Sequence, residues 1–153
     1  VQTCALPILH PEGGHVFLPR HPKDPEGGIC PYHKNCLEGF ASGPAIEARW
    51  GKKAVELVDR PEVWELESYY IAQALVDYIL VLSPQKIILG GGVMHQEQLF
   101  PMIRANVLEM LNGYINTEEL GDMDNYIVPA SLKDNQGIMG CIKLGLNALD
   151  ASR

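Results

Sequence analysis

Apolar side chains recur at helical spacing along most of the chain beyond residue 36. The clearest stretch runs from Val63 to Leu82, with Pro61 at a position typical of a helix start. Ser83 and Pro84 follow it, and the residue before a proline disfavours helical backbone. The pattern therefore predicts one long, nearly buried helix that ends there. The same spacing predicts further helices over residues 38–49, 52–58, 96–111 and 137–149.

Two short runs interrupt the helical pattern and predict strands. Lys86–Leu89 is rich in β-branched residues and is closed by three glycines, and Tyr126–Ser131 has a similar apolar character. Strands that alternate with helices are typical of an α/β fold, in which helical crossovers connect the strands of one sheet. We therefore expect an α/β lobe over residues 37–153.

The segment before this lobe has a different character. Residues 9–36 are rich in proline, glycine and histidine and contain few apolar residues, so neither a helix nor a strand is predicted. A loop of this length inside a compact domain is uncommon unless it is functional or cross-linked, and a bound metal would replace the missing core. Residues 1–8, which include Cys4, show no periodicity and are interpreted as a non-native leader.

Composition and charge narrow the class of protein. Hydrophobic residues make up 46% and charged residues 20% of the 153-residue chain, as in globular proteins, and the formal net charge is −7. That charge disfavours partners bound through many phosphates, so neither nucleic acid nor a membrane is expected as a partner. Without a transmembrane run or a signal peptide in view, we expect a cytoplasmic protein whose cysteines bind metal rather than form disulfides.

Four residues of the loop are typical of a metal site. His15, Cys30, His33 and Cys36 have the spacing H-x14-C-x2-H-x2-C. Zn²⁺ prefers four thiolate and imidazole ligands at tetrahedral corners, and two thiolates would balance its charge. We predict a structural zinc site, since four protein ligands leave no open position for an activated water. The alternative is that these are unrelated polar residues of a loop.

Two glutamates lie beside the predicted ligands. Glu12 precedes His15 by three residues, and Glu38 follows Cys36 by two. Carboxylates accept hydrogen bonds from hydroxyl groups, and a metal-bound histidine can present its second ring nitrogen as a fixed donor. The set therefore suits a polyol or a sugar. The alternative is that both glutamates are solvent-exposed charges.

The motifs Glu12-Gly13-Gly14-His15 and Cys30–Ala45 resemble the ROK family of sugar kinases and sugar-responsive repressors. The resemblance runs from about residue 10 to the end of the chain. It implies part of an actin-like, ribonuclease-H-like sugar kinase lobe with a zinc-stapled loop, and a homodimer. It also implies that the sugar contacts Glu12, His15 and Glu38, and that the adenosine side of an ATP site is lined by Gly90, Gly91 and Gly92. A tight turn would also explain the glycine triplet.

The stretch Cys30–Gly51 is similar to the bacterial fructokinase branch of that family, although most ROK members have a cysteine-richer cluster where this chain has Cys30-Pro31-Tyr32-His33. This resemblance implies that Mg-ATP phosphorylates a hexose, with fructose converted to fructose 6-phosphate. In ROK kinases the phosphate loop and the aspartate base lie in the amino-terminal half, and no residue here corresponds to them. We therefore expect a carboxyl-terminal portion that is inactive alone. The alternatives are the effector domain of a ROK repressor and a free-standing zinc module for protein contacts.

Overall fold

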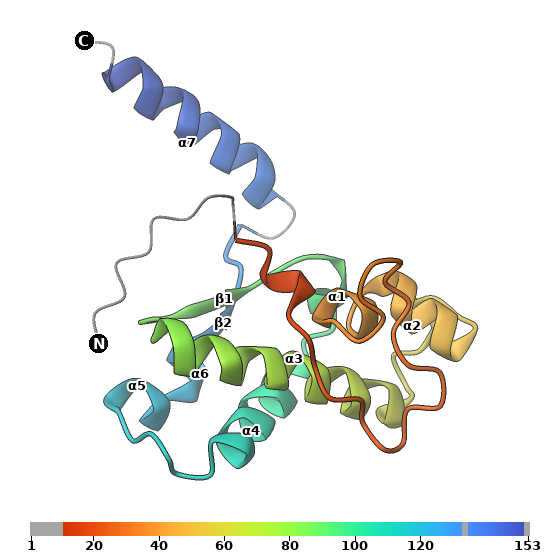
Figure 1. The fold of residues 1–153 in the computed structure, drawn as a ribbon. Coiled ribbons are helices and arrows are strands. Elements are labelled where there is room, and N and C mark those ends of the chain that lie inside the picture. The colour runs from red at the N-terminus through yellow and green to blue at the C-terminus, as the bar shows by residue number, and fades with distance from the viewer. Residues whose placement is uncertain (1–10, 133–134, 152–153) are drawn as a thin grey trace.

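The computed structural model describes residues 11–132 and 135–151, so the leader predicted at residues 1–8 lies outside the described residues. Figure 1 shows a small sheet with helices packed against it and one helix, the last, standing apart. The elements in chain order are η1 (Gly13–His15), α1 (Leu37–Phe40), α2 (Gly43–Trp50), η2 (Ala54–Glu56), α3 (Pro61–Leu82), β1 (Ile87–Leu89), η3 (Gly92–His95), α4 (Leu99–Leu111), α5 (Glu118–Gly121), α6 (Met123–Tyr126), β2 (Ile127–Pro129) and α7 (Gln136–Ala151).

The sheet of the described residues consists of β1 and β2, which are parallel. Ile87 pairs with Ile127 and Leu89 with Pro129, and α4 lies in the connection between the two strands. A parallel pair joined through a helix is the unit of an α/β fold, so the predicted fold class is confirmed. Both strands are one to three residues shorter than predicted; the second begins only at Ile127 because Tyr126 ends a helix.

Helices α3 and α4 pack against each other and enclose the main core. The helix predicted from Pro61 to Leu82 is confirmed, and it ends at Ser83, which has the left-handed backbone conformation common at helix C-termini. Full burial of a large apolar side chain stabilises a fold by about 1.5–3 kcal/mol. The core residues with under 2% exposure include Ile46, Leu57, Val63, Trp64, Leu99, Ile103, Val107 and Ile127.

The prediction of one helix over residues 38–49 is wrong. The structure divides this segment into α1 and α2, which meet near Ser42. The thiol of Cys36 and the hydroxyl of Ser42 each accept a backbone N–H from the first turn of the helix that follows. Two separate N-caps satisfy groups that a single helix would bond internally, and so they favour two short helices over one long one.

Other helices differ from the prediction in extent. The helix predicted over residues 52–58 is a single 3-10 turn, η2, and the one predicted from residue 96 begins only at Leu99. The four-residue helices α5 and α6 were not predicted, because a single turn is too short to show a period. Each is capped by a side chain that accepts a backbone N–H, Thr117 for α5 and Asp122 for α6.

Helix α7 extends away from the other elements in Figure 1, and none of its residues is buried. Its apolar side chains are largely exposed; Ile138, Ile142, Leu144 and Leu146 are 51–70% exposed. None of the helices in the described part of the chain is both long and apolar enough to cross a bilayer.

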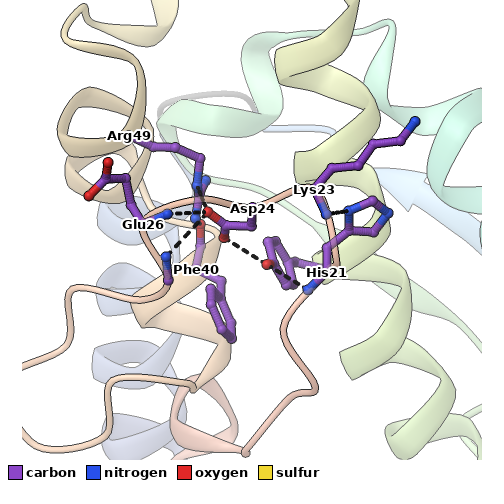
Figure 2. A network of polar contacts seen from close by, with 8 residues as sticks. His21, Lys23, Asp24, Glu26, Phe40 and Arg49 are labelled. Carbon is purple, nitrogen blue, oxygen red and sulfur yellow. Dashed lines mark hydrogen bonds and ion pairs between the residues drawn. The ribbon is translucent and has the colours of Figure 1, made fainter.

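A buried carboxylate joins the proline-rich loop to α2 and α3, as Figure 2 shows. The side chain of Asp24 is fully buried and accepts hydrogen bonds from Tyr70 Oη at 2.7 Å and from Arg49 Nε at 3.1 Å. The backbone N–H groups of Glu26 and Gly27 donate to the same carboxylate at 3.2 and 3.3 Å. Four donors from three parts of the chain thus converge on one side chain.

The surroundings of Asp24 hold it ionised. Burial alone would raise the pKa of this carboxyl, but the hydrogen bond from Tyr70 and the charge of Arg49 bring the pKa of Asp24 below its ordinary value. Arg49 also donates from Nη2 to the carbonyl of Phe40 at 3.1 Å, which ties α2 to α1. Removing one partner of such a buried pair costs about 3–5 kcal/mol, because the other charge stays buried and unpaired.

Glu67 of α3 is a second buried carboxyl with a different environment. Its side chain is fully buried, and neither oxygen has a hydrogen-bond partner within the described ranges. Burial raises the pKa of Glu67 to about 8, although the charge of Arg49 acts in the opposite direction. The folded protein therefore keeps Glu67 protonated at neutral pH.

We predict that Glu67→Gln removes part of the pH dependence of stability. In the unfolded chain this carboxyl has its ordinary pKa of about 4.5, whereas in the folded protein the pKa is about 8. Between these values the unfolded chain has lost a proton that the folded protein retains, so rising pH favours unfolding. The free energy of unfolding, measured with urea at pH 5, 6.5 and 8.5, should fall with pH by a few kcal/mol more in the wild type than in the variant. The exposed Glu65→Gln on the same helix is the control, and parallel pH profiles for wild type and Glu67→Gln would contradict the assignment.

Candidate metal centre and adjoining pockets

The four predicted ligands converge. The ligand atoms of His15, Cys30, His33 and Cys36 all lie within 4.8 Å of one another. His15 Nδ1 is 3.7 Å from Cys36 Sγ and 3.9 Å from Cys30 Sγ. Zinc bonds of about 2.0–2.3 Å place the corners of a tetrahedral thiolate and imidazole site roughly 3.4–3.8 Å apart. The two Nδ1–Sγ separations are close to those values.

Backbone pairing brings the two ligand-bearing segments together. Phe17 and Cys36 form an antiparallel bridge, and the hydrogen bonds on either side of it are Leu18 N–H to Asn35 O at 2.9 Å and Leu37 N–H to Val16 O at 3.0 Å. His15 is the residue just before this paired segment. The pairing therefore carries His15 to the end of the loop that holds the other three ligands.

Close backbone contacts within the loop require glycine at two positions. A Cβ at Gly28 would lie 1.5 Å from Lys34 O, and one at Gly39 would lie 2.5 Å from the same atom. The Cβ placed on Gly39 would also lie 3.1 Å from the side chain of Cys30. Any larger residue at these two positions would force apart the backbone segments that carry the predicted metal ligands.

Backbone N–H groups point at both thiols. His33 N–H donates to Cys30 Sγ and Gly39 N–H donates to Cys36 Sγ, each at 3.4 Å. The hydrogen bond from His33 lowers the pKa of Cys30, whereas burial raises the pKa of Cys36. The two thiols are thus unequal, and a bound cation would favour the thiolate form of both.

The donor set fits zinc. His33 Nδ1 is buried and has no hydrogen-bond partner in the described part of the chain, so an imidazole lone pair or N–H is enclosed there at a cost. Two soft thiols and two imidazoles whose ligand atoms lie within 4.8 Å of one another match the preference of Zn²⁺, while Mg²⁺ and Ca²⁺ prefer oxygen ligands. The residues that the sequence analysis assigned to the metal are therefore the ones that the fold brings together.

His15 faces two environments. Its Nδ1 lies toward the thiols, and its Nε2 is 3.3 Å from Glu38 Oε2. If a metal ion were bound at Nδ1, the ring proton would reside on Nε2, which could then donate a hydrogen bond to the Glu38 carboxylate. The carboxylate is on the solvent side of this pair, since the side chain of Glu38 is 60% exposed and that of His15 only 29%.

Glu12, the third residue predicted to contact a sugar, stands at the start of the same turn. It is exposed, and its carbonyl accepts the N–H of His15 at 3.0 Å, which closes η1. Glu12 and His15 therefore belong to one turn of backbone, and Glu38 reaches the same histidine from α1. Glu12 is thus joined to His15 through the backbone and Glu38 through its side chain, and we call these three residues the rim of the candidate metal centre.

A separate pocket of about 780 Å³ lies at the carboxyl ends of β1 and β2. Ligands of open α/β sheets bind at this edge, and the volume is that of a small-molecule site. Of the three glycines expected to line an ATP site, Gly90 and Gly91 line this pocket, whereas Gly92 is not among its lining residues. Gly91 has φ +96°, which favours glycine, and a Cβ at Gly90 would lie 3.1 Å from Gln136 Nε2.

The helix predicted from residue 96 begins later, because Gly92–His95 form a 3-10 turn and α4 starts at Leu99. Most of the pocket wall was not predicted. Side chains from the turn, α4 and the start of α7 complete it, namely Met94, His95, Glu97, Phe100, Pro101, Arg104 and Gln136.

A family model described as the ROK family matches residues 8–148. A fructokinase of Pediococcus pentosaceus is 50% identical over 141 residues, which cover 92% of this chain and 48% of that protein. An N-acetylmannosamine kinase of Pasteurella multocida is 27% identical over 126 residues, covering 73% of this chain and 42% of that one. The chain thus spans about half the length of the curated relatives it matches.

A solved structure has the same fold. The ROK hexokinase from Thermus thermophilus superposes with a TM-score of 0.66 at 22% identity, over 84% of this chain and 45% of that one. At this identity the likeness concerns the fold alone. The family model, by contrast, extends over most of the sequence and includes both the ligand-bearing loop and the glycine turn, and on that ground the chain belongs to the ROK family.

Proposed function

We propose that this chain supplies the hexose pocket and part of the nucleotide pocket of an ATP-dependent sugar kinase whose substrate is fructose. The observation that carries the proposal is the His15 ring, with one nitrogen toward two thiols and the other 3.3 Å from Glu38. A ring fixed on one side offers a directed N–H on the other, next to a carboxylate acceptor. The matching fructokinase supports the choice of fructose.

In this proposal His15, Cys30, His33 and Cys36 hold a structural Zn²⁺. When bound, the ion supplies only cross-linking, because all four positions are filled by protein ligands. The residues themselves do the rest. Glu12 and Glu38 accept hydrogen bonds from sugar hydroxyls, and His15 Nε2 donates one.

Mg-ATP occupies the pocket at the carboxyl ends of β1 and β2. Gly90 and Gly91 let the backbone approach the nucleotide closely, and apolar side chains such as Met94 and Phe100 suit the adenine ring. Gly92 contributes to the nucleotide pocket only as the first residue of the turn η3. Arg104 is held by its two hydrogen bonds to Ile127 O, at 3.0 and 2.7 Å, and stiffens the wall.

The reaction is transfer of the γ-phosphoryl group to a terminal hydroxyl of fructose. The hydroxyl oxygen bonds to the γ-phosphorus, the bond from that phosphorus to the bridging oxygen breaks, and ADP leaves. The hydroxyl proton passes to a base, and we assign no residue of this chain to that role. The working enzyme is a cytoplasmic homodimer in which an amino-terminal half provides the base and the phosphate loop.

The first prediction concerns turnover by the enzyme encoded by the complete reading frame. We expect ADP release that depends on hexose, with kcat/KM highest for fructose and lower for glucose and N-acetylmannosamine. A coupled assay with these three sugars measures it. Absence of turnover with every hexose, combined with sugar-dependent binding to DNA, would rule out the proposed kinase activity and favour a repressor.

The second prediction concerns the metal. Purified protein should contain about one zinc per chain by elemental analysis, and Cys36→Ser should lose most of it because three ligands bind zinc far more weakly than four. The exposed Cys141→Ser is the matched control and should keep its zinc. Full zinc content in Cys36→Ser would refute this set of ligands.

The third prediction concerns the hexose. Glu38→Gln removes a charged acceptor, so fructose should bind about tenfold or more weakly, while ATP affinity and zinc content stay unchanged. Isothermal titration with each ligand measures the two affinities. Glu47→Gln, an exposed change on α2, serves as the control. An equal loss for fructose and ATP would remove Glu38 from the hexose pocket.

A further inference from the structure

The turn that carries Glu12 and His15 is too short to be rigid by itself. η1 is a single 3-10 turn of three residues, and its two internal hydrogen bonds are His15 N–H to Glu12 O and Val16 N–H to Gly13 O. Such turns have poor hydrogen-bond geometry and little cooperativity. The thiol cluster fixes the ring of His15, but it lies at one end of the turn. The other end, toward Glu12, needs a contact of its own.

Tyr78 of α3 provides that contact. Its hydroxyl donates to Gly13 O at 2.6 Å, across 65 positions of sequence. The ring itself is partly buried and packs against both apolar clusters of the protein. The hydroxyl thus stands on a rigid base, since α3 is the long central helix of the core. Gly13 O accepts two hydrogen bonds, one from inside the turn and one from α3.

The glycine at position 13 reflects this close approach. A Cβ built on Gly13 would lie 3.0 Å from Tyr78 Oη and 3.4 Å from Cζ, and within the described residues the next atom outside its chain neighbours is Tyr78 Cε1 at 3.7 Å. The hydroxyl is therefore the atom that excludes a side chain here. Gly13, which belongs to the motif Glu12-Gly13-Gly14-His15, is therefore in direct contact with Tyr78 of α3.

We propose that Tyr78 is a positioning residue for the hexose pocket: through the carbonyl of Gly13 it fixes the turn that presents Glu12 and the Nε2 face of His15. The inference rests on the proposed function, in which these two side chains contact the sugar. The proposed role of Tyr78 runs through Gly13 and includes no direct contact with the sugar or the metal. Its effect should therefore appear in hexose affinity and in local exchange at the turn, and not in zinc content.

The test compares Tyr78→Phe with Tyr126→Phe in the zinc-containing chain. Tyr126 Oη donates to the carbonyl of Pro84 at 3.1 Å, so each variant loses one hydroxyl-to-carbonyl bond and keeps its ring. In Tyr78→Phe we expect amide hydrogen exchange at His15 and Val16 to be about threefold to tenfold faster, with fructose bound weaker by a similar factor. The amides of Leu18 and Leu37, the zinc content and the urea midpoint should match those of the control.

A second pair of variants tests the contact without relying on Tyr78→Phe alone. Gly13→Ala should speed exchange at the turn in the wild-type background, because its Cβ meets the Tyr78 hydroxyl. In the Tyr78→Phe background it should add little, because the nearest remaining ring atom is at an ordinary contact distance. Additive effects of the two changes would overturn the contact as the cause.

The outcomes separate the two proposals. If Glu12→Gln and Glu38→Gln leave fructose affinity unchanged, the hexose pocket is wrong, and hydrogen exchange still decides whether Tyr78 fixes the turn. If those changes weaken fructose while Tyr78→Phe behaves as Tyr126→Phe does in both measurements, the positioning role is wrong and the pocket stands.

Discussion

The loop before α1 contains too few apolar residues to fold by burial, so its shape depends on polar contacts at two points. One is the cluster of two thiols and two imidazoles, whose atoms lie within 4.8 Å of one another. The other is the carboxylate of Asp24, which collects hydrogen bonds from Tyr70 and Arg49. Between these points the backbone is constrained at both ends, which limits the conformations of a segment with no regular structure. The rim formed by Glu12, His15 and Glu38 depends on this double attachment.

Helix α3 contacts both the proline-rich loop and the helix that lines the pocket at the strand ends. Through Tyr70 it holds the buried carboxylate, through Tyr78 it holds the turn at Gly13, and its opposite face packs on α4. Helix α4 in turn contributes to the wall of the pocket at the ends of the strands. The candidate metal centre and the pocket at the strand ends are therefore both attached to the packed pair of α3 and α4. A change in the packing of α3 would reach both, whereas loss of the Tyr78 hydroxyl would act at the turn beside the metal centre.

Much of this arrangement could be predicted, and the parts that could not have a common reason. The long helix and the strands follow from local periodicity, and the metal ligands follow from residue type at short spacing. Asp24 and Tyr70 are 46 positions apart, and Tyr78 and Gly13 are 65 apart, so neither contact leaves a local signal. Ser42 broke the predicted helix because a cap competes with apolar spacing that continues on both sides. The wall of the pocket at the strand ends was missed because it depends on which face of α4 meets the sheet.

The exposed apolar side of α7 affects how this chain behaves in solution. The net charge of −7 gives mutual repulsion between molecules near neutral pH, and the sequence pI of about 5.1 marks where that repulsion vanishes. Added salt screens the charges but leaves the attraction between apolar surfaces intact. Colloidal stability of this chain is therefore best in dilute buffer well above its isoelectric point, and concentrated salt or mild acid favours association through exposed apolar surface such as that of α7.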